Sequence, residues 1–131
     1  MDVKVASHVI EQMFAHSRDA DPQECCGILL GDGKRIERAV LAQNVHPSPQ
    51  THFEIDPQML IDAHRGAREG GLQVVGYYHS HPVGKAKPSK TDAAMASGDG
   101  RIWAIVAAET VRFWQDQPDG FAAVSYEVLE R

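Results

Sequence analysis

The spacing of apolar residues at the start of the chain predicts a strand followed by an amphipathic helix. Residues 3–6 are typical of a short strand, and Ser7 is a candidate N-cap for a helix that continues to about Asp19. One face of that helix is apolar, formed by Val9, Ile10, Met13 and Phe14. Asp21-Pro22 then ends the helix, because a proline cannot continue the helical hydrogen bonding.

A hairpin is the next element that the pattern predicts. Residues 25–31 and 34–43 are candidate strands, and Asp32-Gly33 between them is a strong turn signal. Residues 44–51 contain two prolines and are expected to form a loop, and residues 53–55 are a candidate short strand.

The middle of the chain predicts a helix and then the strand that carries the most informative residues. Asp56 is placed as an N-cap with Pro57 at the first helical position, and Gly70-Gly71 should end the helix. Residues 72–81 are a candidate strand, and residues 82–88 a loop.

The last third of the chain predicts a short helix and the rest of a sheet. Ser89 should start the helix, which ends near Gly98, and strands should follow at residues 101–108, 110–115 and 120–129. Strands and helices therefore interleave around one sheet, as in an α/β sandwich, and the hairpins imply that much of the sheet is antiparallel. A single domain over residues 1–131 is expected.

Composition and charge narrow the function classes. The net charge of −5 argues against non-specific binding to nucleic acid or to an anionic membrane. No apolar run approaches the length of about 20 residues that a membrane helix needs, and the N-terminal stretch is not typical of a signal peptide. We therefore expect a cytoplasmic protein.

The two cysteines, Cys25 and Cys26, are adjacent. On a strand their side chains point to opposite faces, so they cannot share a metal ion. We expect both to pack as small buried residues.

The segment from His79 to Asp92, HSHPVGKAKPSKTD, contains the candidate chemistry. His79 and His81 lie on the same side of a strand, and Pro82 favours extended backbone at His81. Asp92 follows Ser89 in the first turn of the predicted helix. Two imidazoles and a carboxylate can hold one metal ion with a fourth position open for water, which is the pattern of catalytic zinc.

Each half of this pattern has a simpler interpretation when it stands alone. A His-x-His pair is commonly a surface or core pair, and Ser-x-x-Asp commonly only caps a helix. The remaining histidines are expected to be solvated or to pack against neighbours: His8, His16, His46, His52 and His64.

Taken together, the motifs resemble those of the JAMM (MPN+, prokaryotic JAB) zinc metallopeptidases. The run His-Ser-His-Pro, six further residues and then Ser-x-x-Asp matches the family signature without substitution, and PQECCGILLG at residues 22–31 resembles its early glutamate and Gly-rich strand. The resemblance implies the JAB1/MPN, cytidine-deaminase-like fold: a mixed, largely antiparallel sheet flanked by helices. It does not imply deaminase chemistry, because the His-x-Glu and Pro-Cys-x-x-Cys motifs of zinc deaminases are absent.

The resemblance also assigns roles. It implies that Zn²⁺ is held by His79, His81 and Asp92, that Glu24 is the general base, and that Ser89 donates to the oxyanion. The sequence alone does not separate Glu24 from four other glutamates, of which Glu54 is the main rival: Glu11, Glu37, Glu54 and Glu69. Capping the helix and donating to the oxyanion would compete for the Ser89 hydroxyl.

The function that the resemblance implies is hydrolysis of a peptide or isopeptide bond after the Gly-Gly tail of a ubiquitin-like or sulfur-carrier protein. The alternatives are a cell-wall peptide hydrolase of the phage-tail type and a non-catalytic MPN scaffold. The regions that ubiquitin-chain-cutting relatives use to grip ubiquitin are short in this sequence, for example residues 44–55. We therefore expect small carrier proteins to be better substrates than ubiquitin chains. The oligomeric state is not predicted.

Overall fold

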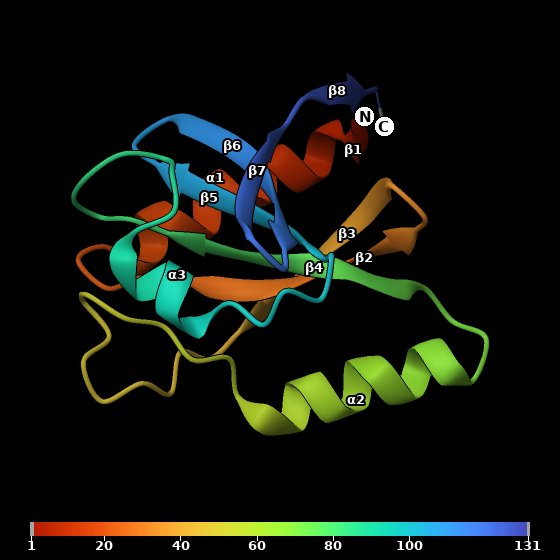
Figure 1. Cartoon of the computed structure of the whole chain (residues 1–131), viewed down its shortest axis with the longest axis horizontal. Coiled ribbons are helices and arrows are strands. Elements are labelled where there is room, and N and C mark those ends of the chain that lie inside the picture. Colours follow the sequence, from red (N-terminus) through yellow and green to blue (C-terminus); the bar gives the residue numbers. More distant parts are fainter. Residues whose placement is uncertain (1, 131) are drawn as a thin grey trace.

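The computed structural model describes residues 2–130, which form eight strands and three helices (Figure 1). The strands are Val3–Ala6 (β1), Cys26–Asp32 (β2), Arg35–Ala42 (β3), Gln73–Ser80 (β4), Ile102–Ala107 (β5), Thr110–Gln117 (β6), Gly120–Val124 (β7) and Tyr126–Leu129 (β8). The helices are Ser7–Ala20 (α1), Pro57–Arg68 (α2) and Lys90–Met95 (α3). Met1 and Arg131, the ends of the predicted domain, lie outside the described residues. No helix among residues 2–130 is long and apolar enough to span a bilayer.

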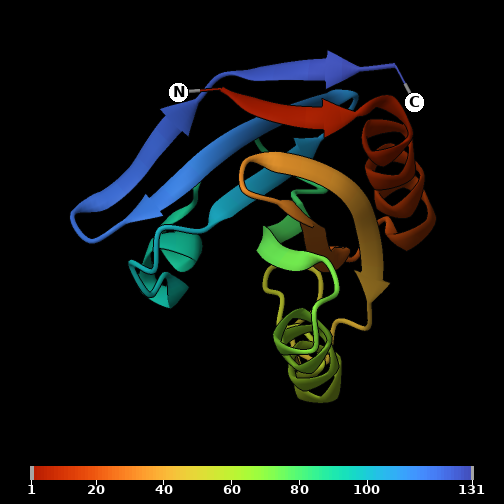
Figure 2. The ribbon, with the colours of Figure 1, turned by 90° about the vertical axis from the view of Figure 1, so that its right-hand side faces the viewer.

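All eight described strands form one mixed sheet in the order β7-β6-β5-β4-β2-β3-β1-β8. Four of the seven neighbouring pairs of these strands are antiparallel and three are parallel. The predicted mixed sheet flanked by helices is therefore confirmed. β7 and β8 follow one another in the chain yet lie at opposite edges, so the sheet curls and brings its two edges near each other (Figure 2).

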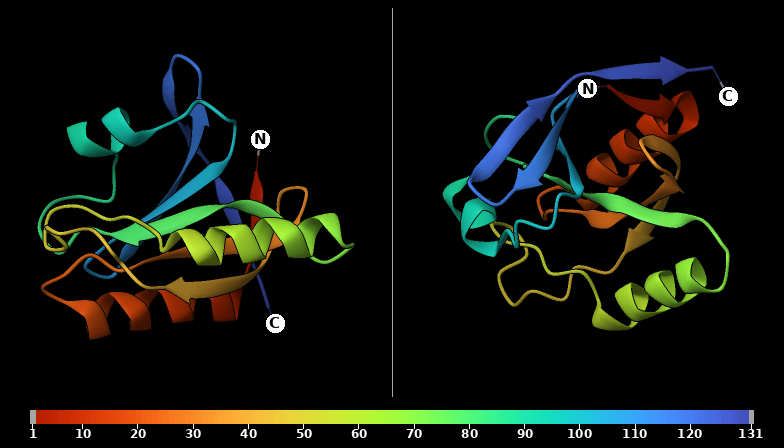
Figure 3. Two further views of the ribbon diagram at one scale, coloured as in Figure 1. Left: turned by 90° about the horizontal axis from the view of Figure 1, so that it is seen from below. Right: turned by 45° about the vertical axis from the view of Figure 1, so that its right-hand side comes forward.

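The two faces of the sheet bury separate apolar clusters. One cluster packs against α1 through Val9 and Met13, and the other packs against α2 through Met59 and Leu60. Figure 3 shows α1 and α2 on different sides of the central strands. Cys25 belongs to the first cluster and Cys26 to the second, and both are buried free thiols, as predicted.

The helix boundaries differ from the prediction at two ends. Ser7 is the first residue of α1, and the N-cap is Ala6, whose side chain makes no capping hydrogen bond. The prediction of Ser7 as N-cap is therefore wrong, because β1 runs directly into the helix. α3 ends at Met95, before Gly98, because Ala96 is already extended with ψ 140°. The predicted Asp56 cap and Pro57 start of α2 are confirmed.

Three predicted strands also differ in extent. The single strand expected at residues 120–129 is divided at Ser125 into β7 and β8. The Ser125 carbonyl accepts a hydrogen bond from Val3 N (3.0 Å), and the chain continues from there as β8 at the other edge of the sheet. In the segment 53–55 only Ile55 pairs, through an isolated bridge to Asn44. β4 ends at Ser80, so His81 is the first residue beyond it.

Candidate metal centre

Two histidines and one aspartate meet where the parallel strands β4 and β5 end. His79 is on β4, opposite Ile105 of β5. His81 lies just past the strand, and its backbone N–H donates to Val106 O (2.8 Å), so it continues the pairing with β5. Asp92 is the third residue of α3 and completes a capping box with Ser89. The strand pair and the helix start therefore position all three side chains.

The three side chains converge on one point. His79 Nε2 and His81 Nε2 lie 3.1 Å apart, and Asp92 Oδ2 lies 3.1 Å from each of them. Neighbouring ligand atoms in a tetrahedron with bonds of about 2.0–2.2 Å are about 3.3–3.6 Å apart. The observed separations are close to this value, so these residues fit a metal ion with only small adjustments. Three ligands leave a fourth tetrahedral position open.

The surroundings of His79 and Asp92 favour the protonation forms of these two residues that bind a metal. His79 is 1 % exposed and Asp92 2 % exposed. Burial lowers the pKa of His79, which favours the neutral imidazole that can coordinate a cation. Burial alone would raise the pKa of Asp92, but hydrogen bonds to His79 and His81 bring it well below its usual value. The aspartate is therefore a carboxylate.

Contacts around the triad fix how the ligands are oriented. His81 Nδ1 donates to Lys85 O (2.7 Å), which leaves its Nε2 free to coordinate. Ser89 N donates to Asp92 Oδ2 (3.0 Å). The His79 ring stacks on Phe53 with a centroid distance of 4.3 Å and meets Trp103 edge-on at 5.7 Å. Packing therefore orients His79.

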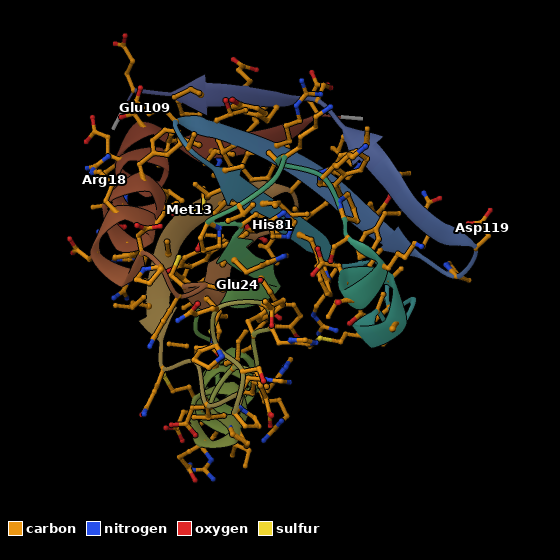
Figure 4. The ribbon with its side chains drawn as sticks, turned by 90° about the vertical axis from the view of Figure 1, so that its left-hand side faces the viewer. Met13, Arg18, Glu24, His81, Glu109 and Asp119 are labelled. Atoms are coloured by element: carbon orange, nitrogen blue, oxygen red, sulfur yellow. The ribbon has the colours of Figure 1, made fainter. Side chains whose placement is uncertain are left out.

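Glu24 is the glutamate that the structure places beside the triad. It is 7 % exposed and lines a cavity of about 390 Å³ together with His81 and Ser89. Figure 4 shows Glu24 and His81 close together near the centre of the molecule. Burial raises the pKa of Glu24 to about 7, the charge of His81 opposes this rise, and the charge of Asp92 adds to it. Glu54, by contrast, is exposed and lines a different groove.

This raised pKa predicts a stability effect in metal-free protein. A carboxyl that binds its proton more tightly in the folded state stabilises the fold below its unfolded pKa of 4.5, and this contribution is lost as the pH rises toward about 7. Glu24→Gln should therefore be more stable than wild type at pH 8 by about 1–2 kcal/mol, allowing for partial solvent access. The advantage should vanish near pH 4.5. Urea unfolding of both metal-free proteins across this pH range measures the difference in their free energies of unfolding. A difference that does not change with pH would contradict the burial effect.

Ser89 lines the same cavity, and its hydroxyl oxygen accepts a hydrogen bond from Asp92 N (3.0 Å). The predicted competition between its two roles does not follow from this geometry. A hydroxyl has one donor hydrogen and two acceptor lone pairs, so the cap uses the oxygen and leaves the hydrogen available. Ser89 can therefore cap α3 and donate into the cavity at the same time.

The sequence did not identify Phe53 and Trp103 as neighbours of the site. Both are buried beside His79 but come from segments distant in the chain. The other five histidines lie outside the triad, as expected: His16, for example, bonds to the Tyr78 hydroxyl at 2.8 Å, and His46 stacks on His52.

Comparisons with known proteins agree with this fold and motif. The family model for prokaryotic homologs of the JAB domain matches residues 6–117. A desampylase from Haloferax volcanii is 29 % identical over 113 residues, which cover 82 % of this chain and 81 % of that protein. A CysO-cysteine peptidase from Mycobacterium tuberculosis is 30 % identical over 105 residues, which cover 79 % of this chain and 71 % of that protein.

Solved structures show the same architecture. A protein from Desulfitobacterium hafniense superposes with a TM-score of 0.86 at 29 % identity, over 98 % of this chain and 94 % of that chain. A JAB1/MPN domain protein from Archaeoglobus fulgidus has a TM-score of 0.62 at 15 % identity, over 96 % and 97 % of the two chains, and shows the fold alone. With the family model matching most of its length, this chain belongs to the prokaryotic JAB-domain family.

Proposed function

We propose that this protein is a zinc-dependent peptidase that hydrolyses the bond after the Gly-Gly tail of a ubiquitin-like or sulfur-carrier protein. The observation that carries the proposal is the convergence of His79, His81 and Asp92, because His81 also lines the cavity that Glu24 lines. Membership of the JAB family supports it, as do the relatives, which are a desampylase and a CysO-cysteine peptidase. Nitrogen and carboxylate ligands with one open position favour zinc over the harder, oxygen-seeking cations.

The groups around the cavity would have three different roles: metal-assisted activation, proton transfer and stabilisation of the oxyanion. A bound zinc ion would polarise the scissile carbonyl and lower the pKa of a water molecule. Glu24, with a pKa near 7 in the metal-free protein, is suited to take a proton from that water and deliver it to the leaving amine. Ser89 is placed to donate its free hydroxyl hydrogen to the developing oxyanion.

The surface near the site suits a narrow, extended tail. A groove of about 320 Å³ lies next to Phe53 and Trp103, the two rings that pack on His79. Its lining is largely apolar, with Ile55, Leu60, Tyr77 and Met95, and it also includes Glu54 and Asp99. A firm grip on a whole ubiquitin fold would need roughly 800 Å² per partner. Two connections of this chain offer little surface for such a grip: residues 44–55, in which Asn44 and Ile55 form an isolated bridge, and the two residues that join β5 to β6. A glycine tail lets the scissile carbonyl approach closely because it has no side chains.

The compartment is part of the same proposal. Cys25 and Cys26 are both buried and unpaired, which suits a reducing environment. We propose that the protein acts in the cytoplasm.

A substrate panel tests the proposal. Small carrier proteins extended past their Gly-Gly ends should be cleaved, and ubiquitin dimers at the same concentration should be cleaved at least about tenfold more slowly, because little surface is available to hold them. Intact-mass spectrometry identifies the products and the bond. Efficient dimer cleavage without carrier cleavage would refute the size argument. Cleavage of neither by zinc-loaded protein would favour a scaffold or a cell-wall peptide hydrolase.

A further inference from the structure

Glu24 lies between α1 and β2, in a stretch without helix or strand. Within residues 2–130, no side-chain hydrogen bond holds its carboxylate, which is what a proton acceptor facing a cavity requires. Its backbone, however, is held on both sides of the Cα atom. Glu24 N donates to Pro49 O (2.7 Å), and Glu24 O accepts from Asn44 Nδ2 (3.0 Å). Both partners come from the segment 44–55.

Asn44 organises that segment through its side-chain amide. Its Nδ2 also donates to His52 O (3.0 Å), and its Oδ1 accepts from His46 N (3.1 Å) and Glu54 N (3.0 Å). An amide group offers two donors and an oxygen with two lone pairs, so every site on this side chain is used. A flipped amide would direct its NH₂ group at two N–H donors, so the orientation is unambiguous.

We propose that Asn44 is a positioning residue that fixes the Glu24 carboxylate in the cavity by holding the Glu24 carbonyl oxygen. This inference rests on the proposed role of Glu24 as general base. The hydrogen bond from Asn44 and the bond to Pro49 restrain the backbone torsions on either side of the Glu24 Cα atom. The segment that restrains Glu24 is itself ordered by the same amide. Asn44 therefore acts through Glu24 and does not touch the reacting atoms.

Asn44→Asp separates the hydrogen bonds that the Asn44 side chain accepts from those that it donates. A carboxylate can still accept from His46 N and Glu54 N, but it has no hydrogen to donate to Glu24 O or to His52 O. We expect kcat for a tail-extended carrier protein to fall about 10- to 100-fold, since small displacements of a catalytic group have effects of this size. KM should change less than about twofold, and zinc content should not change, because no metal ligand is altered.

Gln43→Glu is the matched control. Gln43 is exposed, and within residues 2–130 its one hydrogen bond outside the helices and strands is from Asp56 N to its backbone carbonyl (3.2 Å). The change adds the same charge one residue away without removing a side-chain hydrogen bond, so kcat should stay within about twofold of wild type. A readout independent of activity is amide exchange in metal-free protein. Exchange at Glu24 N should accelerate about tenfold in Asn44→Asp and not in Gln43→Glu.

A double-mutant cycle with Glu24→Gln decides between positioning and a merely structural role. If Asn44 acts through Glu24, Asn44→Asp should lower the residual rate of Glu24→Gln by less than about twofold. The same fold-loss in both backgrounds, or an unchanged kcat in Asn44→Asp alone, would overturn the proposal. Should Asn44→Asp fail to fold, the cycle is run with Asn44→Ala, which adds no charge and is judged by the same criterion. Full activity of Glu24→Gln alone would instead show that the proposed function of Glu24 is wrong, and the inference would fall with it.

Discussion

Glu24→Gln is expected to lower kcat for tail cleavage by about 10²- to 10⁴-fold while leaving the fold and the zinc content unchanged. The amide keeps the volume of the carboxyl group but cannot take a proton. Glu24 is also the glutamate that lines a cavity with His81 and Ser89, and its raised pKa near 7 suits an acid–base role at neutral pH. Cleavage of a tail-extended carrier protein, followed by mass spectrometry, measures the loss.

Glu54→Gln is the control for this loss. Glu54 is exposed and lines the neighbouring groove, so its substitution should leave kcat within about twofold of wild type and affect mainly KM. An inactive Glu54→Gln together with an active Glu24→Gln would reverse the assignment of the base.

His81→Ala should reduce both zinc content and cleavage to near background. Loss of one of three ligands leaves His79 and Asp92, which together hold a divalent ion too weakly to survive purification. His81 is a better probe than His79, because the His79 ring is packed between Phe53 and Trp103 and its removal would also leave a cavity in the core. Elemental analysis should show about one zinc per chain in wild type and little in the variant.

His64→Ala is the matched control, since His64 lies on α2 and outside the triad. It should keep both zinc and activity. Equal zinc in wild type and His81→Ala would show that the metal binds elsewhere.

Local patterns predicted most of the elements, and the reasons are visible in the structure. Asp56 and Pro57 start α2 as expected because cap chemistry is local. The division at Ser125 was not predictable, because it depends on β8 finding β1 at the far edge of the sheet. Ser7 appeared to be the N-cap, but the helix already begins at Ser7, so Ala6 at the end of β1 occupies the cap position.

The candidate site also contains residues that local spacing predicted and residues that it did not. His79 and His81 are two residues apart on extended backbone, so their convergence followed from strand geometry. Nothing in the residue pattern alone connected Glu24, Phe53 or Asn44 to them. These residues reach the site through β2 pairing with β4 and through long-range hydrogen bonds, which a single sequence does not reveal.

The measurement that tests the central claim most directly is a zinc titration of chelator-stripped protein, with cleavage of a tail-extended carrier protein as the readout. Wild type should be inactive without metal, gain activity in proportion to added zinc and reach a plateau at about one equivalent per chain. Glu24→Gln should bind the same equivalent of zinc and remain inactive. Full cleavage by stripped protein would contradict a zinc peptidase. Zinc-dependent cleavage by Glu24→Gln that reaches the wild-type rate would contradict the role of Glu24 in activating water.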